Sequence, residues 1–171
     1  KPYKENWANT KVILKKKIWT VEDKNNDNNT WEDLDAGAPA YNGANATVNA
    51  DDWLVSPPLH LIAGQTYALE AGAVVGGHSG TGQRMNIAYG TGDDPTTYNE
   101  IVPTTPISGT AFGTPTTIKT TFTPTETGDY RIGFHAVSDR PGYIIMRPVK
   151  VEEAAETSGT PIAISDLKLE T

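Results

Sequence analysis

One stretch of the sequence has oxygen-bearing side chains at a spacing that suits metal binding. Asp or Asn stands at every second position there, at Asp23, Asn25, Asp27 and Asn29. A loop that curls around a hard cation needs oxygen donors at such intervals, and Ca²⁺ takes roughly six to eight of them from carboxylates, amides and backbone carbonyls. We therefore predict that these four side chains bind Ca²⁺.

The same composition has a simpler interpretation, because Asn and Asp also form hydrogen-bonded turns in solvated loops that bind no metal. The segment is not an EF-hand, since position 12 of such a loop is Leu34 and not the bidentate Glu. Glu32, Asp33 and Asp35 follow as further carboxylates. The sequence alone is compatible with a calcium site and with a solvated loop that binds no metal.

Aromatic side chains form a second candidate site. Rings that lie beside polar or turn residues are expected at the surface, where they can stack on a sugar. Four rings fit that description, and we predict them as ligand-binding residues: Trp31, Tyr41, Tyr98 and Tyr143. The alternative is that each ring anchors its loop by burial, which is the more common habit of aromatic residues.

Patterns that would indicate catalysis are incomplete. The stretch Gly77-His78-Ser79-Gly80-Thr81 lacks the final glycine of a nucleophile elbow. The adjacent carboxylates Asp51 and Asp52 point to opposite faces if they lie on a strand, so they do not converge on one bond. We predict that this protein is not an enzyme.

Composition and charge narrow the class of protein. The 171 residues include 16 glycines, 12 prolines and no cysteine, and the net charge is −7. Many glycines and prolines without a long helical period favour a turn-rich all-β chain. The acidic balance argues against nucleic-acid binding, which needs a basic face. No apolar run approaches the roughly 18 residues of a membrane span.

The segment Asp51–Pro58 has the strongest strand signal. Trp53, Leu54 and Val55 are strand formers, and Pro57 and Pro58 remove two backbone donors, so pairing must end near Ser56. Alternating apolar residues predict further strands at 66–71, 85–89, 118–122, 130–134 and 144–151. The predicted core contains Trp53, Leu54 or Val55, Leu69, Ile87, Phe122, Ile132 and Phe134.

Other segments are less regular. We expect extended chain at 11–14, a long irregular loop at 33–47 and a flexible glycine-rich connection at 72–82. Residues 96–102 fit either a helical turn or a short strand.

The sequence Trp53-Leu54-Val55-Ser56-Pro57-Pro58 resembles a signature of the cleaved-adhesin and choice-of-anchor domains of secreted bacterial surface proteins, which include the gingipain adhesins. The resemblance covers residues 1–153 and has further anchors at 3–7, 19–31 and 129–138. It implies a two-sheet antiparallel β-sandwich of the jelly-roll type. The family's Asp-x-Asp-Gly-Asp loop corresponds to Asp23, Asn25 and Asp27, with Asn25 replacing a carboxylate and Asn26 replacing the glycine.

The family resemblance also implies a function. It points to a non-catalytic adhesion or binding module at the bacterial cell surface or outside the cell, with a host protein, a matrix protein or a glycan as partner. A carbohydrate-binding module attached to a hydrolase and a structural spacer domain are the alternatives.

The chain ends in two short segments of different character. Residues 154–160 have the composition of a linker, and 161–171 read as the first strand of a following fibronectin-like or immunoglobulin-like domain, or else as a terminal strand of the sandwich.

Overall fold

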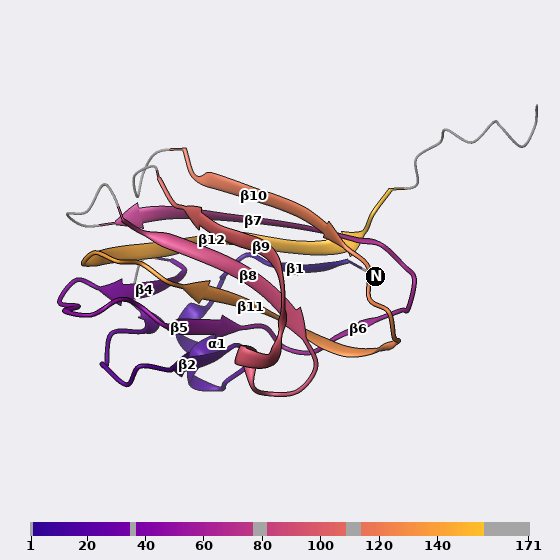
Figure 1. Cartoon of the computed structure of the whole chain (residues 1–171), viewed down its shortest axis with the longest axis horizontal. Coiled ribbons are helices and arrows are strands. Elements are labelled where there is room, and N and C mark those ends of the chain that lie inside the picture. The colour runs from indigo at the N-terminus through magenta and orange to yellow at the C-terminus, as the bar shows by residue number, and fades with distance from the viewer. Residues whose placement is uncertain (1, 35–36, 77–81, 109–113, 156–171) are drawn as a thin grey trace, which may run out of the picture.

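The structure, a computed structural model of the whole chain, describes residues 2–34, 37–76, 82–108 and 114–155. Strands dominate it, with one short α-helix and one turn of 3₁₀-helix among the described residues (Figure 1). The elements up to the first proline-rich turn are β1 (Tyr3–Glu5), α1 (Thr10–Lys15), β2 (Thr20–Asp23), β3 (Trp31–Asp33), β4 (Pro39–Gly43) and β5 (Asp52–Val55). The remainder are β6 (Leu59–Leu61), β7 (Tyr67–Gly76), β8 (Arg84–Gly90), η1 (Pro95–Thr97), β9 (Asn99–Pro106), β10 (Thr116–Phe122), β11 (Gly128–Ala136) and β12 (Gly142–Glu153).

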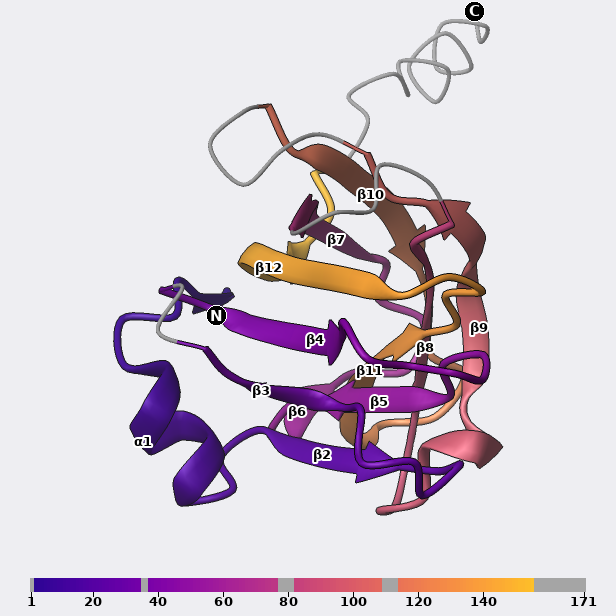
Figure 2. The same ribbon diagram turned by 90° about the vertical axis from the view of Figure 1, so that its left-hand side faces the viewer.

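The strands form two antiparallel sheets of six, which confirms the predicted sandwich. One sheet has the order β10-β7-β12-β4-β3, with β1 also paired to β12. The other has the order β2-β5-β11-β8-β9, with β6 also paired to β11. Figure 2 shows β12, β4 and β3 of the first sheet one below the other, with α1 beside β3. Neighbours in each sheet are mostly distant in sequence, as in a jelly roll.

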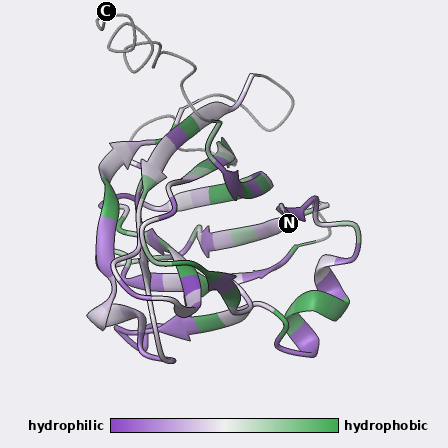
Figure 3. Ribbon diagram, turned by 90° about the vertical axis from the view of Figure 1, so that its right-hand side faces the viewer, coloured by the Kyte–Doolittle hydropathy of each residue, from purple (hydrophilic) through white to green (hydrophobic). Residues whose placement is uncertain are grey.

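The core lies between the sheets and takes alternate residues from each strand. Polar and apolar positions alternate along the ribbons in Figure 3, as expected for strands with one buried face. Most of the predicted core is confirmed there, namely Leu54, Leu69, Ile87, Phe122, Ile132 and Phe134. Trp53 is buried as well, but it lies outside this core on the outer face of its sheet with Val55, Ala88 and Tyr98. Successive residues of a strand point to opposite faces of the sheet, so Trp53 faces outward because Leu54 faces the core.

The end of β5 is fixed by a serine. Ser56 is buried, its N–H donates to the Ile132 carbonyl (2.9 Å), and its hydroxyl oxygen accepts from the Ile132 N–H (2.8 Å). The side chain thus continues the ladder for one step past the last strand residue. Pro57 and Pro58 then turn the chain away, as predicted.

The expected extended chain at 11–14 is wrong, because α1 occupies those residues. Thr10 and Ile13, which are three positions apart, are buried on one face, and Val12 is exposed. Asn9 caps the helix, since its side chain accepts from the Val12 N–H. Val12 and Leu14 therefore do not share the buried face of a strand. Leu14 packs at the edge of the core, and Val12 does not.

Two segments that we expected to be irregular contain strands. The loop predicted for 33–47 includes β4, whose Ala40 and Tyr41 are buried, so short apolar residues among glycines form an interior strand. The connection predicted for 72–82 is β7 up to Gly76, and residues 77–81 lie outside the described residues. The segment 96–102 contains both a helical turn and a strand, the two alternatives that we predicted for it, because β9 follows η1 almost directly.

The pairing register of β12 shifts at one point, and the side chain of Trp7 forms a hydrogen bond with the strand there. The pairing of β12 with β7 shifts between Met146 and Val149, where Pro148 has no N–H to donate. The indole Nε1 of Trp7 donates to the Arg147 carbonyl (2.9 Å). Trp7 thereby satisfies a carbonyl at the bulge.

The predicted linker and terminal segment fall almost wholly outside the described residues, because 156–171 are not described. Among the residues that are described, no helix is long and apolar enough to cross a membrane.

Candidate metal centre

The pairing of β2 with β5 brings two carboxylates face to face. In this antiparallel register Asp23 lies directly opposite Asp52. Like charges at such positions repel one another and destabilise a sheet. A proton or a cation between the two groups would relieve this repulsion.

The turn after β2 adds a third carboxylate. Both oxygens of Asp23 accept backbone hydrogen bonds, one from Asp27 N–H (3.3 Å) and one from Asn28 N–H (2.9 Å). Asn26 and Asn28 have φ of 53° and 65°, a left-handed conformation that Asn tolerates in place of Gly. This turn folds the chain back so that carboxylate oxygens of Asp23, Asp27 and Asp52 lie within 4.8 Å of one another.

Asp52 is the most unusual of the three. Its side chain is completely buried, and only one of its oxygens has a hydrogen bond, from the Asp51 N–H at 2.9 Å. Burial raises the pKa of Asp52 to about 7, an effect that the hydrogen bond from Asp51 and the neighbouring Thr30 hydroxyl oppose and the charges of Asp23 and Asp27 reinforce. A buried carboxylate oxygen without a partner is costly unless a proton or a metal ion satisfies it.

Asn25 supplies a second buried oxygen without a partner. Its amide nitrogen donates to the Asn49 carbonyl (2.9 Å), which fixes the side chain, while Oδ1 is buried and accepts no hydrogen bond from the described residues. Carboxylate and amide oxygens are the donors that Ca²⁺ takes in proteins. The three carboxylates, one of which has an unpaired buried oxygen, are a donor set that fits a hard cation.

Asn29, the fourth residue predicted as a ligand, contacts the Asp27 carboxylate. Its amide Nδ2 donates to the Asp27 carboxylate (3.2 Å), and its backbone N–H donates to the other oxygen of that carboxylate (2.9 Å). These contacts hold Asp27 in place. Asn29 therefore orients a candidate ligand, and the amide nitrogen that it presents to Asp27 is not a metal donor.

The predicted exposure of Trp31 and Tyr41 is not observed. Their residues are 2% and 1% exposed, and their rings meet edge to face at 6.2 Å. Trp31 Nε1 donates to the Asp52 carbonyl (3.0 Å), and burial together with the charges of the three aspartates raises the pKa of Tyr41. The two rings form the apolar wall of the acidic cluster and offer no face to a sugar.

Tyr98 and Tyr143 are partly exposed and lie far apart in the fold, Tyr98 between η1 and β9 and Tyr143 in β12. Tyr143 lies in β12 between Asn42 and Gly76. Tyr98 lies over β8 and β11, where its hydroxyl donates to the Gly92 carbonyl (2.7 Å) and its ring meets Trp53 edge to face. The structure therefore does not bring the four predicted aromatic residues together.

A polar aromatic cluster lies beside Tyr98 on the outer face of β5 and β11. The His135 ring is stacked on Trp53 at 3.9 Å, nearly parallel. Its two nitrogens contact Asp51 Oδ1 (2.7 Å) and Asn86 Nδ2 (3.2 Å). Burial lowers the pKa of His135, and the hydrogen bond with Asp51 opposes that shift. At neutral pH, therefore, the ring is a neutral, firmly oriented group.

Asp52 is the site residue that the sequence did not reveal. Its signal is a carboxylate inside the strongest strand motif of the chain, directly before three buried residues. That signal becomes specific only when β2 is known to pair with β5, because the pairing places Asp52 opposite Asp23.

No protein-family model and no curated protein matches this sequence. Solved structures show similarity in fold. The K1 cleaved adhesin domain of Lys-gingipain from Porphyromonas gingivalis W83 superposes with a TM-score of 0.67 at 18% identity, covering 91% of this chain and 99% of that domain. The K2 cleaved adhesin domain of Lys-gingipain gives 0.65 at 12% identity, over 89% and 99%. The chain has the fold of these adhesin domains.

A carbohydrate-binding module also has a similar fold. The C-terminal CBM6 of LamC, a marine laminarinase from Zobellia galactanivorans, gives a TM-score of 0.51 at 14% identity, covering 90% of this chain and all 100% of that module. The likeness to this module is one of architecture.

Proposed function

We propose that this chain is a non-catalytic binding module of an extracellular bacterial surface protein, and that Ca²⁺ bound by Asp23, Asp27 and Asp52 stabilises it. The fold supports the first part, because it is that of the gingipain cleaved adhesin domains. The single observation that carries the second part is the buried, unpaired oxygen of Asp52 facing two further carboxylates.

The metal would join two parts of the chain. Asp23 and Asp27 belong to the turn after β2, whereas Asp52 begins β5. Asn25 would add a neutral oxygen from the same turn, and water or backbone carbonyls would complete the coordination. Binding would cancel the repulsion among the three carboxylates and fix the turn against the end of the sandwich.

Thermal unfolding in chelator and in millimolar Ca²⁺ tests this part. A ligand that binds only the folded state stabilises it by about 2.7 kcal/mol at a hundredfold excess over its dissociation constant. We expect a higher midpoint with Ca²⁺ for the native chain and no shift for Asp27→Ala. Asp129→Ala is the control, because Asp129 is an exposed carboxylate that contacts the exposed imidazole of His60. Equal midpoints in chelator and Ca²⁺ for the native chain would contradict the proposal.

Carbohydrate binding is a second candidate, favoured by the outer face of β5, β8 and β11. The partly exposed Tyr98 lies there, packed on the buried Trp53, together with His135, the half-exposed carboxylate of Asp51 and the guanidinium of Arg131. Aromatic rings next to oriented polar groups are the elements of a sugar-binding surface.

An array that carries both glycans and extracellular-matrix proteins separates the two kinds of partner. Binding to a glycan that Tyr98→Ala weakens at least about tenfold would support this surface. Tyr143→Ala is the matched control, because Tyr143 lies on the other sheet. Loss with Tyr143→Ala alone would move the site to β12, and binding to matrix proteins alone would favour adhesion without sugar recognition.

A further inference from the structure

The segment around α1 concentrates positive charge in an acidic protein. Residues 11–17 contain four lysines and no acidic residue, although the net charge of the chain is −7. All four lysines are exposed, and so are two apolar side chains beside them. We call this set the basic patch; its members are Lys11, Val12, Lys15, Lys16, Lys17 and Ile18. Figure 2 shows α1 at the margin of the molecule, outside the strands of both sheets.

Hydrogen bonds fix the end of α1 and hold the patch in place. The Lys17 N–H donates to the Leu14 carbonyl (3.1 Å), and the Ile18 N–H donates to the Ile13 carbonyl (2.9 Å). This pair of bonds is the Schellman motif, in which the turning residue is left-handed and usually glycine. Here the turning residue is Lys17, with φ of 55°. The last residues of the patch are thus held against the helix.

The lysines of the patch have no counter-charge within the described part of the chain. None of them forms an ion pair with a described residue. Lys11 and Lys15 are four positions apart on a helix, where like charges repel one another. Five other cationic side chains do have acidic partners: Lys24, Arg84, Lys119, Arg131 and Lys150. The patch would therefore gain from an anion outside the chain.

The patch also exposes apolar surface that charge does not explain. Val12 and Ile18 are 37% and 44% exposed, two of the four large apolar side chains at the described surface. The negative end of α1 favours nearby cations such as Lys15 and Lys16. It does not account for Lys11 or for aliphatic side chains in water.

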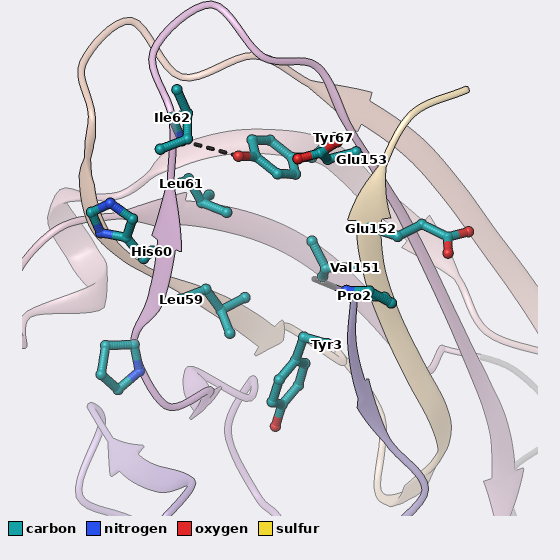
Figure 4. Close-up of a pocket in the computed structure, with 11 residues that line it drawn as sticks. Pro2, Tyr3, Leu59, His60, Leu61, Ile62, Tyr67, Val151, Glu152 and Glu153 are labelled. Carbon is teal, nitrogen blue, oxygen red and sulfur yellow. Dashed lines mark hydrogen bonds between the residues drawn. The ribbon is translucent and has the colours of Figure 1, made fainter. Parts of the chain in front are cut away.

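The groove between β6 and the end of β12 has a different charge. Figure 4 shows Glu152 and Glu153 at this groove, and none of its described lining residues is a lysine or an arginine. An anionic surface would repel these carboxylates and attract α1. The charge distribution would thus orient the molecule with the basic patch toward such a surface.

We propose that the basic patch binds the surface of a membrane that contains anionic phospholipids, with the lysine ammonium groups at headgroup phosphates and Val12 and Ile18 at the boundary of the acyl chains. A soluble polyanion would pair with the lysines but leave both aliphatic side chains in water, whereas a membrane interface takes up both kinds of group. Carboxylates more than about 10 Å from the lipid are largely screened at about 0.1 M salt. This goes beyond the proposed function and requires neither calcium nor a sugar.

Sedimentation with lipid vesicles in the presence of chelator tests the charge requirement, because chelator prevents calcium from bridging protein and lipid. We expect binding to vesicles of phosphatidylcholine and phosphatidylglycerol in equal amounts, and none to pure phosphatidylcholine. Each lysine near an anionic surface contributes about 1 kcal/mol, roughly fivefold in binding, so Lys15→Gln with Lys16→Gln should weaken binding at least about tenfold. Lys119→Gln with Lys150→Gln is the matched control, because it changes the net charge equally on β10 and β12 and should leave binding within about twofold.

The apolar contribution separates a membrane from a soluble polyanion. Val12→Ser with Ile18→Ser should weaken binding to the mixed vesicles and leave any binding to heparin unchanged. Val48→Ser, which alters another exposed apolar side chain, should affect neither. Lys17→Gly should raise the melting temperature, because glycine adopts the left-handed conformation without strain, and yet weaken vesicle binding.

Four results would each overturn the proposal. They are no binding to the mixed vesicles, equal binding to pure phosphatidylcholine, equal loss for the two lysine pairs, and binding to heparin without binding to vesicles.

Discussion

Asp52 illustrates how a single side chain links sequence motif and candidate site. It begins the strand of the Trp-Leu-Val-Ser-Pro-Pro motif, yet its carboxyl points at the turn after β2. A fully buried carboxylate beside two others can be neutralised by a proton or by a cation. The proposed calcium and the raised pKa are therefore two outcomes of the same geometry.

The calcium-free protein should become less stable as the pH rises through neutrality. Because the pKa of Asp52 is raised from 3.8 to about 7 in the folded state, its protonated form contributes stability that is fully present below pH about 4 and is lost as pH rises toward 7. The shift of about three units corresponds to at most about 4 kcal/mol. Denaturant unfolding in chelator at several pH values measures this decline.

Asp52→Asn is the matched variant for that experiment. An amide cannot ionise, so its free energy of unfolding should lack the part of the pH dependence that Asp52 causes, and it should exceed that of the native chain above pH 7 in chelator. Parallel pH profiles for the two proteins would refute the assignment.

Trp53→Ala should lower stability and change the titration of its stacking partner. The ring is 6% exposed and packs on Gly133, Tyr98 and His135, so its loss should cost about 3 kcal/mol. Since burial lowers the pKa of His135, removing the indole should raise that pKa. Urea denaturation and NMR titration of the imidazole measure the two effects, and an unchanged imidazole titration would show that the ring does not shield His135.

At the scale of elements, the proline-terminated strand was the most predictable part. Strand formers followed by two prolines specify both the existence and the end of β5, and Ser56 adds a side-chain hydrogen bond where the ladder stops. The helix α1 was not predictable in the same way. Its six residues follow a short apolar pattern that fits either period, and the cap at Asn9 and burial of Ile13 decide the outcome.

Ser56→Ala should cost about 1–3 kcal/mol, because the Ile132 N–H loses its acceptor in a buried position. Thr117→Ala is a control on an exposed strand position and should change stability by less than about 0.5 kcal/mol. Equilibrium unfolding in urea measures both. A neutral Ser56→Ala would mean that another group, or water, replaces the hydroxyl.

At the scale of the whole molecule, alternation and turn residues predicted the sandwich, whereas strand order was beyond reach. β2 and β5 are separated by two other strands in sequence, and the register that sets Asp23 against Asp52 arises only in the assembled sheet. The same limit explains the aromatic residues: Trp31 and Tyr41 stand in polar surroundings in the sequence, but the pairing of β3 with β4 buries them together. Local patterns specify strands, and tertiary pairing specifies sites.

Calorimetric titration of the full chain with Ca²⁺ at pH 8 tests the central claim most directly, because stoichiometry distinguishes a defined centre from diffuse binding to an acidic surface. We expect one Ca²⁺ per chain for the native protein and for Asp129→Ala, and no saturable binding for Asp52→Asn. Absence of binding by the native chain, or equal binding by Asp52→Asn, would contradict the assignment of Asp23, Asp27 and Asp52 as a calcium centre.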